Sequence, residues 1–262
     1  SLRKFRIPAE CASDGPSGIR MDCGTKAFSL PNGTLLGCTF NCELVRQLYE
    51  MTGLELRLNR VDTLLGPGLN IHRNPLNGRN FEYISEDPFL TGKMGAAQLQ
   101  GLNIAGSTGT IKHFAANNQE TKRHEADSVI SVRALREIYL KGFEIAVKEA
   151  QPMSIMTSYN LINGIHAANN YDLCTETARN EWGFKGMIMT DWTTTEVDEK
   201  CTASGCMRAG NDLVMPGCFG DHDNMHKELA EGTLKIEDLK ACIARLVSVI
   251  WKSNQYLSLI HI

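Results

Sequence analysis

The sequence of 262 residues lacks any apolar run that approaches the roughly 18 residues of a membrane-spanning helix. It also lacks a concentrated basic region, because its 27 lysines and arginines are interspersed with 30 aspartates and glutamates and its net charge is −3. We therefore expect neither a membrane nor a nucleic acid as partner. The hydrophobic content of 42% excludes a disordered chain and fits one large domain.

Several signatures of catalysis and cofactor binding are also missing. The chain has no GxGxxG fingerprint, no phosphate-binding P-loop and no GxSxG nucleophile elbow. The nine cysteines include no CxxC pair, so we expect mostly reduced, buried thiols in a cytoplasmic protein rather than a zinc ribbon. His222 and His226 have the spacing of a helical metal site, but a solvated helix start is the stronger interpretation. We expect no metal and no cofactor.

What is present is a repeating pattern of buried strands and amphipathic helices, separated by glycine and proline. About five or six such units predict an α/β fold with a parallel sheet covered on both faces. A (β/α)8 TIM-barrel-like domain that lacks its first β/α unit or units fits this pattern better than an open doubly wound sheet. The expected strands are 61–65, 110–114, 154–159, 187–191 and 212–215. The expected helices are 42–58 with Asn41 as its cap, 88–102, 132–150, 171–182, 223–231 and 236–252, with a further helix between 191 and 212.

Polar side chains gather at the expected strand ends, where a parallel α/β barrel carries its chemistry. Asp191, followed by Trp192, ends an apolar strand, where a carboxylate is costly unless it is paired or lies at the mouth of a pocket. The alternative role for Asp191 is a cap for the next helix. Lys112 and His113 are adjacent, so both reach one ligand only if the strand ends in a turn or bulge. The alternative interpretation is that Lys112 is solvated and that His113 is a core residue hydrogen-bonded to the backbone.

Two further candidates lie in loops. Arg79 could hold a carboxylate such as Asp191, donate to a ligand, or form a surface ion pair worth less than about 1 kcal/mol. His124 and Asp127 are spaced like an acid–base or metal cluster, but a loop ahead of the 132–150 helix is the stronger interpretation.

Five motifs follow one another along nearly the whole chain: Asp14 to Arg20, Gly78 to Glu82 with Ser85 to Pro88, Lys112 to Phe114, Ser158 to Asn160, and Met189 to Trp192. In this order they resemble glycoside hydrolase family 3, and the resemblance is greatest to the β-glucosidase branch. The N-acetylglucosaminidase branch fits poorly, because its loop with a His–Asp pair opens with Pro-Gly, whereas Phe114 is followed here by Ala115 and Ala116.

The resemblance implies a retaining exo-β-glucosidase that acts on a small β-glucoside or cello-oligosaccharide. Asp191 matches the family's nucleophile, Tyr159 matches the tyrosine beside it, and Trp192 matches an aromatic residue that supports the sugar ring. The residues that match those holding hydroxyls of the sugar in subsite −1 are Asp14, Arg79, Lys112 and His113. Alternatives are another exo-glycosidase of the family, such as a β-xylosidase, or a sugar-binding barrel without turnover.

Retaining hydrolysis needs a second carboxyl group roughly 5–5.5 Å from the nucleophile as acid and base. In the β-glucosidase branch this is a glutamate on an α/β-sandwich domain, which we expect to be absent from this chain. Residues 1–253 are then a partial catalytic barrel, weak or inactive by itself, and residues 254–262 are a tail that does not continue the family pattern. With no initiator methionine, we expect a fragment cut at both ends.

Overall fold

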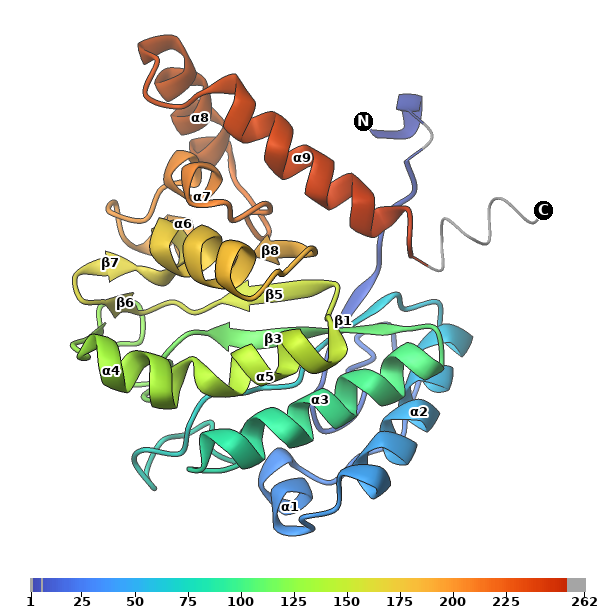
Figure 1. Ribbon diagram of the computed structural model, residues 1–262. Helices are drawn as coiled ribbons and strands as arrows, with labels where there is room; N and C mark the ends of the chain where they lie inside the picture. The colour runs from blue at the N-terminus through green and yellow to red at the C-terminus, as the bar shows by residue number, and fades with distance from the viewer. Residues whose placement is uncertain (1, 6, 254–262) are drawn as a thin grey trace.

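The computed structural model describes residues 2–5 and 7–253, so the expected tail, 254–262, lies outside the described residues. Its main sheet has five parallel strands in the order β1-β2-β3-β5-β8 (Figure 1), and Leu213 extends it through a parallel bridge to Met189. Spatial order thus follows chain order, without the reversal that defines a doubly wound sheet. The TIM-barrel-like α/β class is confirmed. The strands are β1 (Ala12–Asp14), β2 (Thr63–Leu65), β3 (Thr108–Phe114), β5 (Ser154–Thr157) and β8 (Met187–Met189).

Helices cover the sheet, with α2 (Cys42–Leu58), α3 (Pro88–Ile104) and α5 (Lys141–Ala150) side by side on one face (Figure 1). A small second sheet beyond the end of β5 contains β4 (Asp127–Ser128), β6 (Leu161–Ile162) and β7 (Ile165–His166). Within the described residues, no helix is both long and apolar enough to cross a bilayer. The other elements are η1 (Leu2–Phe5), α1 (Gly33–Cys38), α4 (Val132–Ala134), η2 (Leu135–Tyr139), η3 (Ala167–Asn169), η4 (Asp172–Glu181), α6 (Thr194–Val197), α7 (Ala203–Ala209), α8 (Phe219–Glu231) and α9 (Ile236–Ile250).

Several helix starts follow from side chains that accept the first free N–H groups. Asn41 accepts from Leu44, and Ser131 accepts from Ala134, as expected for helices beginning at 42 and 132. The expected 132–150 helix contains a π-helical segment, η2, and the expected 171–182 helix is the π-helix η4. The short strand β1 and helix α1 were not expected from the sequence, because three and six residues are too few to show a period.

Four expected strands are too long, and the one expected at 61–65 begins only at Thr63. The strand expected at 154–159 ends at Thr157, because Ser158 turns to donate its N–H to Phe114 and its hydroxyl to Ala115. The strand expected at 187–191 ends at Met189, which leaves Asp191 in the loop that follows β8. The expected 212–215 strand is reduced to the bridge at Leu213.

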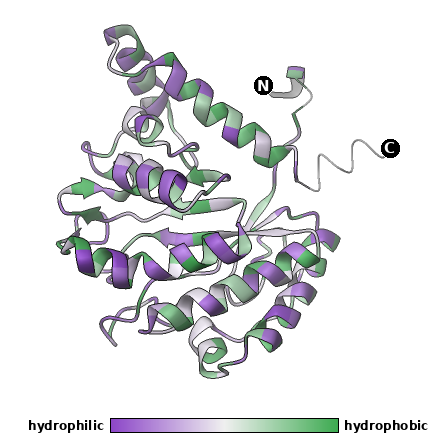
Figure 2. Cartoon of the chain, viewed as in Figure 1, coloured by the Kyte–Doolittle hydropathy of each residue, from purple (hydrophilic) through white to green (hydrophobic). Residues whose placement is uncertain are grey.

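The core lies between the sheet and its helices, where Phe114 packs against Phe143 and Trp182 with ring centroids 5.1 and 5.8 Å away. Figure 2 shows apolar strands interrupted by hydrophilic residues at the end of β3. All nine cysteines are free, but the expectation that most are buried is wrong. Only Cys174, Cys201, Cys206 and Cys242 are buried, because the others lie in loops or at helix ends.

Replacing glycine by alanine should have opposite effects on stability at Gly101, where α3 packs against α2, and at Gly220 in α8. A Cβ at Gly101 would lie 2.2 Å from the carbonyl oxygen of Arg46, whereas a Cβ at Gly220 in α8 has its nearest neighbour 3.5 Å away. We expect Gly101→Ala to lower the free energy of unfolding by about 1–3 kcal/mol and Gly220→Ala to raise it by about 0.5–1 kcal/mol. Urea unfolding measures both, and equal effects would contradict this account of the α2–α3 contact.

Candidate active site

One cavity of about 710 Å³ is lined by all seven residues that the sequence singled out. They come from separate elements that converge because parallel strands end at the same edge of a sheet. Asp14 ends β1, Lys112 and His113 lie near the end of β3, and the others lie in loops after β2, β5 and β8. The seven are Asp14, Arg79, Lys112, His113, Tyr159, Asp191 and Trp192.

Lys112 and Asp14 form an ion pair across the sheet. Lys112 Nζ lies 2.6 Å from Asp14 Oδ1, and the lysine side chain is only 3% exposed. Burial opposes the ionisation of Asp14, but the charge and hydrogen bond of Lys112 outweigh it and lower the pKa of Asp14. The solvated lysine of the alternative interpretation is therefore excluded, and Asp14 is an ionised hydrogen-bond acceptor.

His113 lies beside Lys112 in the same cavity. The register of β3 against β5 shifts between Ile111 and Phe114, which lets adjacent residues reach one site. The buried His113 ring contacts the Tyr83 hydroxyl rather than a backbone group. Burial, with the positive charges of Arg79, Lys112 and Arg123, holds the pKa of His113 well below its ordinary value, so the ring is neutral.

Asp191 is a carboxylate that lines the cavity and is 9% exposed. Its Oδ1 accepts the N–H of Trp192 at 2.7 Å, and its Oδ2 lies 3.7 Å from Nε2 of His113. Burial raises the pKa of Asp191, against the opposing effects of the Trp192 N–H, Arg79, Lys112 and the Tyr159 hydroxyl. Helix α6 begins later, with Thr193 at its N-cap position, so the alternative role of Asp191 as a helix cap is excluded.

Arg79 reaches the cavity from the loop after β2, but its carboxylate partner is Glu82, not Asp191. The Glu82 side chain is 6% exposed, so this is not the surface ion pair considered from the sequence. The pair fixes the guanidinium at the cavity wall, where its charge acts on both Asp191 and His113.

The sequence interpretation missed Arg123, which lines the same cavity. Its guanidinium carbon lies 4.4 Å from the centre of the Tyr159 ring, and its Nη1 donates to Glu120 at 2.9 Å. The neighbouring His124 packs against the same tyrosine, with ring centroids 4.1 Å apart. Arg123 was not singled out, because no apolar period or motif marks it as part of a site.

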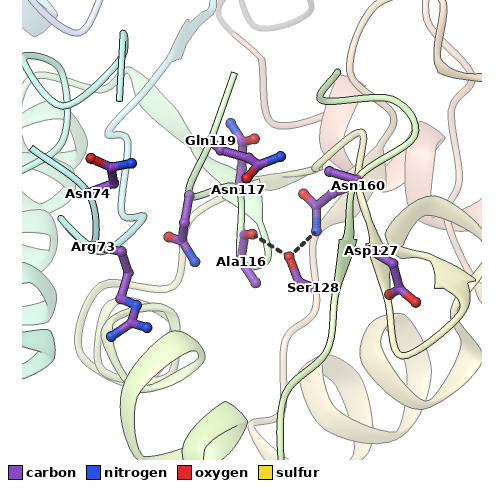
Figure 3. A pocket seen from close by; sticks show the side chains of 10 residues that line it. Arg73, Asn74, Ala116, Asn117, Gln119, Asp127, Ser128 and Asn160 are labelled. Atoms are coloured by element: carbon purple, nitrogen blue, oxygen red, sulfur yellow. Dashed lines mark hydrogen bonds between the residues drawn. The ribbon is translucent and has the colours of Figure 1, made fainter. Parts of the chain in front are cut away.

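A second cavity of about 350 Å³ contains mainly amide side chains (Figure 3). Asn160 donates to Ser128, which donates to the carbonyl of Ala116. Among the described residues that line it, Asp127 is the only acidic one and none is a histidine. Asp191, Arg79, Lys112 and Arg123 line the first cavity. The second cavity is lined by Arg73 and Asp127 but not by His124, so Asp127 and His124 form no cluster there.

The suggested metal site at His222 and His226 is not supported. The two rings contact each other on the exposed side of α8, with their Nε2 atoms 3.1 Å apart. Within residues 2–5 and 7–253, no group of three or more His, Cys, Asp or Glu side chains is arranged to hold a metal ion.

The fold and the site define a class: TIM-barrel-like α/β domains with a pocket at the carboxyl ends of the strands that is lined by carboxylates and cations. Within that class, residues 1–249 match the model of the glycosyl hydrolase family 3 N terminal domain, and the chain belongs to this family.

Relatives and solved structures agree with this assignment. The chain is 53% identical over 260 residues to a β-glucosidase of Ruminococcus albus, which covers 97% of this chain and 28% of that protein. It is 39% identical to an exo-α-(1→6)-L-arabinopyranosidase of Bifidobacterium longum, covering 97% of this chain and 34% of that protein. The structure of β-glucosidase 3B from Thermotoga neapolitana in complex with α-D-glucose matches with a TM-score of 0.92 and 38% identity, over 98% of this chain and 37% of that one. The chain thus spans between 28 and 37% of these proteins' length.

Proposed function

We propose that residues 1–253 are the nucleophile-bearing part of a retaining β-glucosidase, with Asp191 as the nucleophile. The observation that carries this proposal is the buried carboxylate of Asp191, which lines a cavity together with cations, a tyrosine and an exposed tryptophan. Such a carboxylate suits an oxocarbenium-like transition state, whose positive charge it faces.

In the proposed reaction, a carboxylate oxygen of Asp191 forms a bond to the anomeric carbon while the bond to the leaving oxygen breaks. The electron pair leaves with that oxygen, which takes a proton from a general acid. Water then attacks the same carbon, gives its proton to the resulting base and releases Asp191. Asp14 and Lys112, with Arg79 and His113, hold the sugar hydroxyls, and the 41% exposed Trp192 lies where a sugar ring can stack.

We propose that the acid/base is a glutamate on an α/β-sandwich domain of the same parent protein. Asp14 does not suit the role, because Lys112 holds it ionised. Asp22 also lines the cavity, but its side chain is 85% exposed and forms an ion pair with Arg20 at 3.3 Å. The span of only 28% of the Ruminococcus albus β-glucosidase is consistent with further domains.

The proposal includes a substrate class and a cellular location. A β-glucoside or cello-oligosaccharide is the preferred substrate class, because relatives with β-glucosidase names predominate among the matches reported above. The arabinopyranosidase of Bifidobacterium longum favours a pyranoside without the hydroxymethyl group as the second candidate. The cytoplasmic location is supported by nine free thiols.

Trapping with an activated 2-deoxy-2-fluoro-β-glucoside tests the function, since a good leaving group needs little protonation and the fluorine slows release of the sugar. We expect one equivalent of sugar on the chain, mapped to Asp191 by peptide mass spectrometry. Label on any other residue would exclude Asp191 as nucleophile, and no label at saturating reagent would favour a sugar-binding barrel.

The pH dependence of this labelling is expected to report the raised pKa of Asp191. The nucleophile must be ionised, so the rate falls as pH drops through a value above the ordinary pKa of about 3.9 for aspartate. Lys112→Met removes a charge that lowers the pKa of Asp191, so the acid limb moves to higher pH. The matched control is Lys93→Met, which removes an exposed partner of Glu149 and leaves the limb in place. The profile is measured at saturating reagent, and a limb at the ordinary value would contradict the geometry.

A further inference from the structure

The His113 ring contacts Tyr83, a tyrosine that has no role in the proposed reaction. The Tyr83 hydroxyl lies 3.0 Å from Nδ1 of His113, and both residues are fully buried. The backbone of His113 is fixed by Asn70, whose side chain accepts its N–H and donates to its carbonyl, both at 2.8 Å. Nδ1 therefore faces Tyr83, while Nε2 faces the cavity, 3.7 Å from Asp191.

The direction of the Tyr83 hydrogen bond follows from its second partner, Asn117. The Asn117 amide nitrogen lies 3.0 Å from the Tyr83 hydroxyl and 3.2 Å from Glu120 Oε1. A carboxylate oxygen only accepts, so the nitrogen rather than the oxygen of this amide must face both groups. The Tyr83 oxygen therefore accepts a hydrogen bond from Asn117.

The single hydroxyl proton of Tyr83 then has one acceptor, Nδ1 of His113. If Nδ1 carried a proton, two N–H groups would donate to the same tyrosine oxygen. The tyrosine proton would then have no acceptor among the hydrogen bonds of the described residues, and a buried donor without an acceptor costs about 1–3 kcal/mol.

We infer that Tyr83 is a positioning residue that fixes His113 in the tautomer protonated at Nε2, so that the ring presents an N–H donor to the cavity. Burial raises the pKa of Tyr83, which keeps its hydroxyl protonated, and the lowered pKa of His113 keeps the imidazole neutral. The use of this donor, to hold a hydroxyl oxygen of a glycoside, rests on the proposed function. The tautomer itself does not.

Nitrogen NMR of the full chain tests the tautomer directly. With ¹⁵N-labelled histidine, spectra that correlate ring nitrogens with carbon-bound protons separate protonated from unprotonated nitrogens, and His113→Gln identifies the His113 signals. We expect a protonated Nε2 and an unprotonated Nδ1 in the unmodified chain. The reverse pattern, or protons on both nitrogens, would overturn the inference without requiring any variant to fold.

Two matched variants test the role of Tyr83. Tyr83→Phe removes the hydroxyl, and we expect the His113 signals to change from one tautomer to a mixture and glucose affinity to fall by about tenfold. Tyr49→Phe is the control, because it removes an equally buried hydroxyl that donates to Pro16 at 2.8 Å, and should leave the His113 signals unchanged. A single Nε2–H tautomer in Tyr83→Phe would refute positioning by Tyr83, and unchanged glucose affinity would refute the use of the donor. Failure of labelling at Asp191 would refute the proposed function alone.

Discussion

Asp191→Asn is expected to abolish covalent labelling by the activated fluoroglucoside, with a fall in rate of about 10⁴-fold or more. The amide has no negative oxygen with which to form the bond to the anomeric carbon, although it keeps the shape of the side chain. Burial raises the pKa of Asp191, so keeping this carboxylate ionised costs free energy in the folded protein compared with the unfolded chain. The variant should therefore fold with unchanged or higher thermal stability, which separates a chemical defect from a structural one.

The control for this substitution is Asp127→Asn, on the wall of the second cavity (Figure 3). It makes the same change in charge at the same end of the sheet, and its Oδ1 accepts the N–H of Gly164. We expect it to label at the rate of the unmodified chain. Loss of labelling in Asp127→Asn with retention in Asp191→Asn would place the reaction in the second cavity and contradict the assignment to Asp191. The measurement is intact-protein mass against time.

The largest effect on stability is expected for Asp212→Ala. The Asp212 carboxylate is fully buried and joins Arg179 of η4 to Arg245 of α9, at 2.6 and 2.7 Å. It also accepts the N–H of Ile188 in β8 at 2.8 Å. Its removal leaves two partly buried guanidinium groups and one backbone donor without a carboxylate, so we expect a loss of about 3–5 kcal/mol in the free energy of unfolding.

Asp223→Ala is the matched control, because that aspartate is 86% exposed on α8. A change within about 0.5 kcal/mol is expected there. Urea unfolding followed by circular dichroism compares the two variants. A loss below about 1 kcal/mol for Asp212→Ala would show that the arginines find other partners and that the three-residue network does not join the helices to β8.

Much of the fold was predictable because buried strands and amphipathic helices have periods that a sequence displays. The long helices α2, α3 and α9 begin at the expected residues. Boundaries were less predictable where a tertiary contact ends an element, as when Ser158 bonds to Phe114 and Ala115. Strand β1 was missed since three residues are ordered by their pairing with β2 and not by their own pattern.

For the site, the sequence by itself determined which residue types stand at the strand ends and, through its motifs, the family to which the chain belongs. Only the tertiary structure decided the partners: Glu82 for Arg79, Asp14 for Lys112, and Tyr83 for His113. It also added Arg123, which no period or motif marked. The physical reason is that a side chain's charge state and direction depend on burial and on groups distant in the chain, such as Asp14 and Lys112, which are 98 residues apart. Local sequence records the side chain but not those neighbours.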